Sequence, residues 1–270
     1  MNPFPEPSFV VGLGALAFAA VPVIVHGVRG RRRLQAPPVD LATWFARWQI
    51  QHNAPDLDPA QTTVLRLFLT ATFVVARPLV RRGLSPTTIT FAGLWLAFVV
   101  PVSALRSPAL AAGICAVSSI LDGVDGAVAG LSGRATRSGF VLDSVVDRVA
   151  EGAFFLALVA AGGHIASAAA GWAAVVLLEY TRARAGNAGL GEVGVVTIAE
   201  RPTRVLCVVF GLLGAQLQPA HATAIVDTSA ILAALTAIVG IGQLARHIQR
   251  RFADNATETT VRPPARPNNV

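Results

Sequence analysis

The chain contains a series of apolar segments, each close to the length of a membrane-spanning helix, and these segments limit the folds that it can adopt. The hydrocarbon core of a bilayer is about 30 Å thick, and an α-helix of about 20 residues crosses it. Residues 8–28 form the first segment, and five or six more can be read at roughly 87–105, 108–128, 141–162, 164–183, 203–218 and 224–246. Since 53% of the 270 residues are hydrophobic and 14% are charged, the sequence predicts an all-α, polytopic membrane helical bundle.

The basic residues predict how this bundle is oriented. All 22 are arginine, the formal net charge is +7, and they lie between the apolar segments, as topology signals and headgroup contacts do. No nucleic-acid partner is therefore expected, whereas membrane lipids are. On one side fall Arg81 and Arg82, Arg134 and Arg137, Arg182 and Arg184, Arg201 and Arg204, and Arg246, Arg250 and Arg251. Only Arg106 falls opposite, so the arginine-rich side is predicted to be cytoplasmic.

The segments divide the chain into four parts. Residues 1–33 are interpreted as an N-terminal transmembrane anchor, because no basic residue precedes the apolar run as a cleaved signal peptide would require. Residues 34–83 are interpreted as a linker with interfacial helices, and 84–251 as a six-helix membrane domain. Residues 252–270 are polar and Pro-rich, which predicts a disordered tail.

Two amphipathic helices are expected in the second part. Asp40 is a suitable N-cap, and a helix that begins there places Leu41, Trp44, Phe45 and Trp48 on one face. This face fits either the lipid headgroup level or a packed position on the protein surface. The apolar core of residues 61–83 is too short to span comfortably and is expected to lie along the cytoplasmic interface.

Four aspartates interrupt the apolar pattern. Asp122 and Asp125 are three residues apart and Asp143 and Asp147 are four apart, so each pair lies on one side of its helix. The connection GLSGRATRSG is short and rich in Gly and Ser, which favours antiparallel neighbouring helices. The sequence therefore predicts that four carboxylates share one pocket at the cytoplasmic end of the bundle.

Carboxylates this close would repel one another unless cations neutralise them. A site of oxygen ligands without His or Cys favours Mg²⁺ or Mn²⁺, and two such ions about 4 Å apart suit an in-line displacement at phosphorus. Gly123 and Gly126 leave the helix surface bare for a diphosphate. The alternative is that the acids are solvated at helix ends or paired with Arg134, Arg137 and Arg148.

The run DGVDGAVAGLSGRATRSGFVLDSVVD resembles the signature of the CDP-alcohol phosphotransferase family, DxxDGxxAR followed after eight residues by GxxxDxxxD. The residues in register are Asp122, Asp125, Gly126, Ala129, Gly139, Asp143 and Asp147. The segment GLSPTTITFAG is similar to the one that opens the first core span of the family, and the resemblance covers about residues 60–250.

The resemblance implies transfer of a phosphoalcohol from a CDP-alcohol to a second alcohol, with release of CMP. In this family the four aspartates would hold two divalent ions, Mg²⁺ or Mn²⁺, and Asp147, assisted by Asp143, would act on the acceptor hydroxyl. Gly126, Ala129 and Gly139, with Asp125, would form the nucleotide site. A lipid donor such as CDP-diacylglycerol fits a half-buried site at the cytoplasmic face of a bacterial-type cell membrane, in phospholipid biosynthesis.

This chain departs from the signature at one position. Gly130 stands where the signature has Arg, which removes a guanidinium that could contact the nucleotide donor or a neighbouring acid. Arg134 or Arg137 could supply the charge from the same loop.

The acceptor is suggested by two arginine-containing segments, EYTRARAGNAGL and AERPTR. Their arginines either mark the ends of the membrane spans and contact lipid headgroups, or bind a phosphate of the acceptor through bidentate hydrogen bonds. They are similar to segments of bacterial phosphatidylinositol phosphate synthases, which implies a polyol-phosphate acceptor at Arg182 and Arg201, then Arg204. The likeness weakens where a basic residue is expected after Gln243 and Leu244 stands instead.

Two other functions remain open from the sequence. One is a non-catalytic or transport protein with a cation-binding acidic cluster, and the other is an enzyme with a small soluble CDP-alcohol donor and a lipid acceptor. Both a monomer and a homodimer are compatible with the sequence, and small residues such as Gly162 and Gly171 permit helix association.

Overall fold

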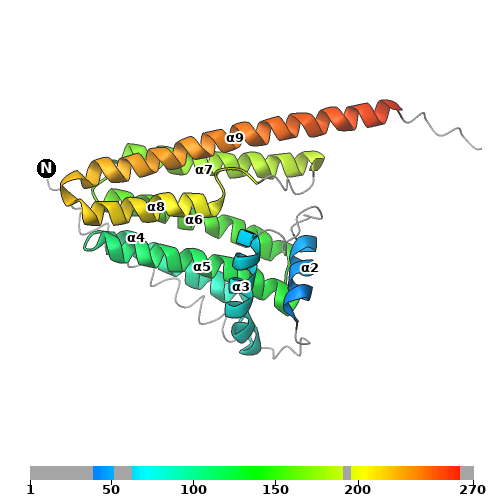
Figure 1. The fold of residues 1–270 in the computed structure, drawn as a ribbon, viewed down its shortest axis with the longest axis horizontal. Helices are drawn as coiled ribbons and strands as arrows, with labels where there is room; N and C mark the ends of the chain where they lie inside the picture. Colours follow the sequence, from blue (N-terminus) through cyan, green and yellow to red (C-terminus); the bar gives the residue numbers. More distant parts are fainter. Residues whose placement is uncertain (1–38, 52–62, 191–195, 262–270) are drawn as a thin grey trace, which may run out of the picture.

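The computed structural model describes residues 39–51, 63–190 and 196–261, and the regular elements in these ranges are all helical (Figure 1). The helices are α2 (Leu41–Gln51), α3 (Thr63–Arg81), α4 (Pro86–Ala104), α5 (Pro108–Ser132), α6 (Arg137–Ala160), α7 (Ile165–Ala185), α8 (Arg201–Leu217) and α9 (Ala222–Val261), with short turns η1 (Gly186–Leu190) and η2 (Pro219–His221). The all-α prediction is confirmed. The predicted N-terminal anchor lies outside the described residues.

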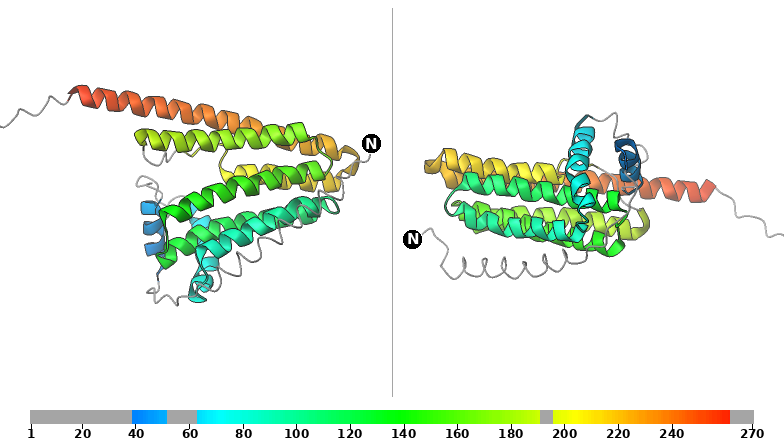
Figure 2. Two further views of the ribbon diagram at one scale, coloured as in Figure 1. Left: turned by 180° about the vertical axis from the view of Figure 1, so that it is seen from behind. Right: turned by 90° about the horizontal axis from the view of Figure 1, so that it is seen from below.

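Helices α4 to α9 run alternately in opposite directions along one bundle, as both Figure 1 and Figure 2 show. Local sequence explains where several of them begin and end. The Ser85 and Ser107 side chains accept hydrogen bonds from Thr88 N and Leu110 N, and Pro stands in the first turn of both α4 and α5. Gly133 ends α5 with a φ of 66°, a conformation that favours glycine.

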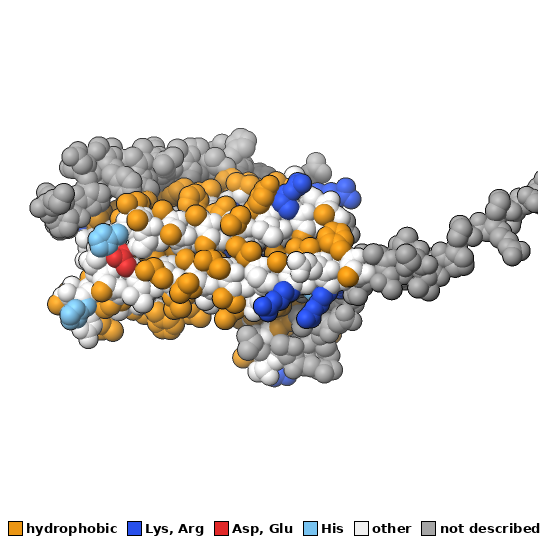
Figure 3. Space-filling view, turned by 90° about the horizontal axis from the view of Figure 1, so that it is seen from above, with side chains coloured by type: hydrophobic (Ala, Val, Ile, Leu, Met, Phe, Trp, Pro, Cys, Tyr) orange, Lys and Arg blue, Asp and Glu red, His pale blue; other side chains and the backbone are white. Residues whose placement is uncertain are grey.

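Three helical stretches are long and apolar enough to cross a membrane within the described ranges: Pro86–Ala104, Pro108–Ser132 and Pro219–Ala253. Helix α8 has 17 residues, and α6 carries acidic and basic side chains within its length, which explains why apolarity alone does not mark them. Figure 3 shows a broad hydrophobic band on one face, with arginines toward one end and histidines at the other. The surface is therefore that of an integral membrane protein.

Helices α2 and α3 cross the bundle near the end where α5 turns into α6 (Figure 1). Trp44 of α2 is 1% exposed, and its indole nitrogen donates a hydrogen bond to the Leu69 carbonyl at 3.2 Å. The apolar face of α2 thus packs against protein, which is the second of its two sequence interpretations. Helix α3 instead leaves Leu67 and Val74 more than half exposed, as an interfacial helix does.

The end of α9 corrects one prediction. Residues 252–261 were expected to belong to a disordered tail, but α9 continues to Val261. This stretch contains neither Pro nor Gly, so nothing in it interrupts a helix that begins in the bundle. Residues 262–270 lie outside the described residues.

At the bundle end remote from α2 and α3, Asp227 of α9 forms hydrogen bonds with the start of α7. Its carboxylate accepts a hydrogen bond from the backbone N–H of His164 at 2.9 Å and from the Ser167 hydroxyl at 2.5 Å. The His164 ring lies 2.6 Å from the other oxygen. Asp227 therefore ties the start of α7 to α9.

Gly171 sets the spacing of three helices. A Cβ at this position would lie 2.9 Å from the Ala230 carbonyl of α9 and would also overlap the Phe155 ring of α6. This glycine is thus used for packing within the chain, where small residues let helix backbones approach.

We expect Gly171→Ala to destabilise the bundle by about 1–3 kcal/mol, because Phe155 and the α9 backbone must both shift. Thermal unfolding in detergent measures the effect. Gly113→Ala is the matched control in α5, because a Cβ there meets nothing within 4 Å. Equal melting temperatures for the two variants would contradict the packing role of Gly171.

Candidate metal centre

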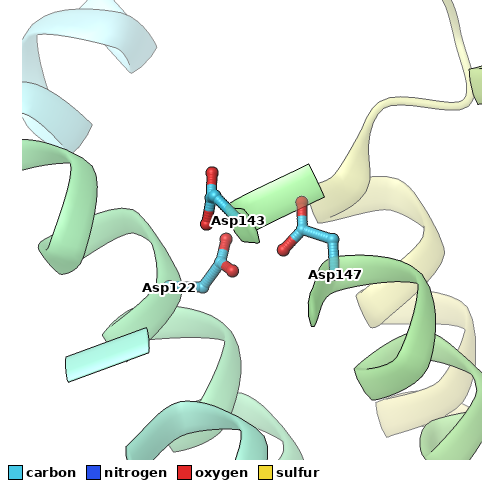
Figure 4. A group of neighbouring side chains, drawn as sticks. All are labelled: Asp122, Asp143 and Asp147. Atoms are coloured by element: carbon cyan, nitrogen blue, oxygen red, sulfur yellow. The ribbon is translucent and has the colours of Figure 1, made fainter. Parts of the chain in front are cut away.

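Three of the four predicted aspartates converge between α5 and α6. Asp122 extends from α5 and Asp143 and Asp147 from α6, and one carboxylate oxygen of each lies within 4.8 Å of the others (Figure 4). The intervening turn begins at Gly133, and the Thr136 hydroxyl oxygen caps α6 by accepting from Gly139 N at 3.0 Å. The antiparallel arrangement expected from the short connection therefore brings the two acidic helix faces together.

Asp125 lies beside this cluster rather than within it. Its side chain is 4% exposed, and it accepts a short hydrogen bond from the Thr90 hydroxyl of α4. Its charge interacts with that of Asp143. The predicted group of four is thus a group of three with a fourth, more deeply buried carboxylate that α4 holds in place.

Arg201 contacts two members of the cluster from the first turn of α8. Its Nη1 atom lies 2.5 Å from Asp122 Oδ2 and also donates to Asp147 Oδ1. Arg148 is a more distant partner of Asp147, at 3.5 Å. The suggested pairing of the acids with Arg148 is thus present, but the main counter-charge is Arg201.

The residues of the cluster fit a hard divalent cation. Three carboxylates and no His or Cys form the kind of ligand set that Mg²⁺ and Mn²⁺ prefer. The Asp143 Oδ1 atom is buried and has no hydrogen-bond partner in the described part of the chain. A buried carboxylate oxygen in that state is stabilised by a cation, because the uncompensated group otherwise costs free energy.

Beneath the cluster lies a buried ionic network. Glu151 is 2% exposed and pairs with Arg204 at 3.2 Å and with Arg148 at 3.0 Å. Arg204, 4% exposed, also reaches Glu179 of α7 at 3.0 Å. Each charged group needs its partners, because removing one partner from a buried ion pair destabilises the folded protein by about 3–5 kcal/mol. The network therefore fixes α6, α7 and α8 around the carboxylate cluster.

Arg182 and Glu200 form the outer part of this network. The Arg182 guanidinium lies 2.8 Å from Glu200 Oε1 and 3.7 Å from Glu179 Oε1. Burial by itself would raise the pKa of Glu200, but hydrogen bonds from Thr197 N and from Arg182 hold that pKa below its usual value. Glu200 is therefore ionised at neutral pH and keeps Arg182 in place. Arg184, by contrast, is exposed.

The predicted nucleotide-site residues have different surroundings. A Cβ added at Gly126 meets nothing within 4 Å, so the helix surface is open there. Gly123 is covered by the Phe68 ring of α3, whose nearest carbon would lie 3.0 Å from an added Cβ. Gly139 permits the Thr136 cap, and Ala129 is half-buried next to Gly130. Of the two glycines expected to be bare, only Gly126 is.

Several side chains of the site were not anticipated from the sequence. Arg47 lies in no motif, and Thr90 lies in the segment GLSPTTITFAG without having been assigned a role; they reach the Gly130 carbonyl and Asp125 from positions distant in the chain. Leu244, which stands where a basic residue was expected, is fully buried in the core, while Gln243 accepts a hydrogen bond from Ile198 N at 3.0 Å.

Comparison with known proteins relates this site to a family. Residues 83–242 match the sequence profile of the CDP-alcohol phosphatidyltransferases. The phosphatidylinositol phosphate synthase of Mycobacteroides abscessus is 34% identical over 161 residues, which cover 54% of this chain and 70% of that protein. The archaetidylinositol phosphate synthase of Pyrococcus horikoshii is 29% identical over 142 residues, 50% of this chain and 72% of that protein.

The fold also resembles that of a solved structure. The crystal structure of Mycobacterium tuberculosis phosphatidylinositol phosphate synthase, in complex with manganese and citrate, superposes with a TM-score of 0.52 at 25% identity. The match covers 66% of this chain and 88% of that one.

The fit of the cluster to a cation predicts the effect of removing one charge. We expect Asp143→Asn to weaken Mn²⁺ binding by at least about tenfold, because it removes the charge that an otherwise unpartnered oxygen carries. Isothermal titration of the detergent-purified protein with Mn²⁺ measures this. Asp227→Asn, at the opposite end of the bundle, is the control and should lower thermal stability without changing Mn²⁺ affinity. The metal assignment would be wrong if both variants bound Mn²⁺ like the wild type.

Proposed function

The chain belongs to the CDP-alcohol phosphatidyltransferase family, and on that premise we propose that it transfers a phosphatidyl group from CDP-diacylglycerol to a phosphorylated polyol, releasing CMP. The observation that carries the proposal is the convergence of Asp122, Asp143 and Asp147 next to Arg201. Carboxylates that fit a divalent cation and an arginine that fits a phosphate are thereby adjacent.

In the proposed reaction the aspartates have two roles, metal binding and proton transfer. Asp122, Asp125, Asp143 and Asp147 would hold two divalent ions, Mg²⁺ or Mn²⁺, which when bound would stabilise negative charge on the diphosphate. Asp147, supported by Asp143, is proposed to orient the acceptor hydroxyl and to take its proton. The acceptor oxygen then forms a bond to the phosphatidyl phosphorus, and the bond from that phosphorus to CMP breaks.

The open surface at Gly126 supports a donor position along α5. We propose that Gly126 and Ala129, with Gly139 and Asp125, shape the nucleotide site. The exposed apolar side chains of α3, such as Leu67 and Val74, suit a donor whose acyl chains remain in the bilayer.

Arg201 and Arg182 are the proposed contacts for the acceptor phosphate. Arg201 lies against Asp122 and Asp147, so a phosphate that it binds would hold the acceptor next to the proposed base. Arg182 pairs at 2.8 Å with Glu200, the residue that precedes Arg201 in the chain. Arg204 is proposed to act indirectly, since its buried guanidinium is already paired with Glu151 and Glu179. Relatives named as phosphatidylinositol phosphate and archaetidylinositol phosphate synthases make inositol phosphate the first acceptor to test.

We also propose the membrane arrangement expected from the sequence. Helices α4 to α9 would be six spans of one catalytic domain, the metal centre would face the cytoplasm, and α3 would lie along that interface. The support is that the arginine-rich ends of α7 and α8 lie at the metal centre, whereas Arg106 follows α4 at the other end.

CMP release from CDP-diacylglycerol, inositol phosphate and Mn²⁺ tests the reaction. The wild type should release CMP only when the acceptor is present, and Asp147→Asn should reduce the rate by about 10²–10⁴-fold because the base is lost. A chromatographic assay of CMP and of the lipid product measures both. A wild type that releases no CMP with any of a panel of polyol phosphates would contradict the proposal, whereas release only with a small soluble CDP-alcohol would indicate the other donor class.

The role of Arg201 is tested by comparing two arginines. Arg201→Gln should raise the KM for inositol phosphate by about tenfold or more, because a charge-assisted contact to phosphate is lost. The exposed Arg184 is the matched control, and Arg184→Gln should leave this KM within about twofold. Unchanged acceptor KM in the Arg201 variant would exclude it as a phosphate contact.

A further inference from the structure

An arginine of helix α2 contacts the backbone at the end of α5. The Nη1 atom of Arg47 donates a hydrogen bond to the Gly130 carbonyl oxygen at 3.1 Å. One turn earlier in α2, the buried Trp44 fixes the helix by donating to the Leu69 carbonyl of α3. Arg47 is therefore held at a defined position, half-buried, by a helix that is packed on both α3 and α5.

The contact falls on a glycine-lined face of α5. Gly123, Gly126 and Gly130 are spaced by three and four residues and so lie on the same side of the helix, next to the side that carries Asp122. Phe68 covers Gly123, the surface at Gly126 is open, and Arg47 reaches Gly130. Along this face, the open position Gly126 therefore lies between the position that Phe68 covers and the one whose carbonyl Arg47 contacts.

The Arg47 guanidinium has more hydrogen-bond donors than the one that it gives to the Gly130 carbonyl. Arginine has five N–H donors in a planar fork that matches phosphate oxygens, and the Gly130 carbonyl takes one of them. Gly130 is also the position where the family signature has an arginine and this chain has none. A guanidinium is therefore present at this site, but α2 supplies it rather than α5.

We propose that Arg47 binds the diphosphate of the CDP-alcohol donor that lies over Gly126, and that it takes the place of the arginine missing at residue 130. This inference rests on the proposed function for the identity of the donor. It makes α2 a part of the donor site, although α2 lies outside the segment that matches the family.

Binding of CDP to the full-length protein in detergent with Mn²⁺, without acceptor, tests the proposal independently of turnover. Arg47→Gln removes the charge and the guanidinium fork, and it should weaken CDP binding by about tenfold. Arg47→Lys keeps the charge but not the planar fork, so it should recover only part of that loss. Arg66→Gln, an exposed arginine on α3, is the control and should bind CDP like the wild type.

A second variant tests the replacement itself. Arg47→Ala combined with Gly130→Arg should restore CDP affinity to within about threefold of the wild type, while Arg47→Ala alone should not. The proposal is overturned if Arg47→Gln binds CDP as tightly as the wild type, since Arg47 would then only fasten α2 to α5. It is also overturned if the double variant binds CDP no better than Arg47→Ala.

These outcomes separate this proposal from the proposed function. A protein that binds CDP through Arg47 but releases no CMP would refute the phosphatidyl transfer and leave the donor contact standing. Normal turnover, together with unchanged CDP binding in Arg47→Gln, would refute the donor contact and leave the phosphatidyl transfer standing. A wild type that binds no CDP would contradict both.

Discussion

The structure depends on the electrostatic balance at the point where α5 meets α6. Asp122, Asp143 and Asp147 lie within a few ångströms of one another at the end of an apolar bundle, a position where like charges repel strongly. Arg201 balances two of them directly. Because α8 supplies that arginine, the position of α8 and the charge state of the cluster are linked. A cation and a guanidinium are thus two ways to neutralise the same carboxylates.

The buried network beneath the cluster explains how this arrangement is held. Glu151 and Glu179 each pair with both Arg148 and Arg204, so three helices share a set of charges, and separating them would leave buried charges unpaired. Small residues such as Gly171 let the same helices approach closely. The hydrophobic surface lies between two ends that carry polar and charged side chains, which suits a lipid environment.

Much of this arrangement could be predicted from the sequence. The apolar segments and the Ser-Pro starts mark the helices of the bundle closely, and the spacing of the aspartates predicts their convergence. The partners of those aspartates could not be predicted in the same way. Arg201 is separated from Asp147 by more than fifty residues, and Arg47 from Gly130 by more than eighty, so no local periodicity relates them. The helical extension beyond residue 251 was also missed, because polar composition was interpreted as disorder.

Anomalous scattering from crystals soaked with Mn²⁺ would establish whether the carboxylate cluster binds metal. We expect anomalous peaks among the carboxylates of Asp122, Asp143 and Asp147, with the Arg201 guanidinium displaced from at least one of them. Manganese bound elsewhere, with Arg201 still paired to Asp122 and Asp147, would contradict this expectation.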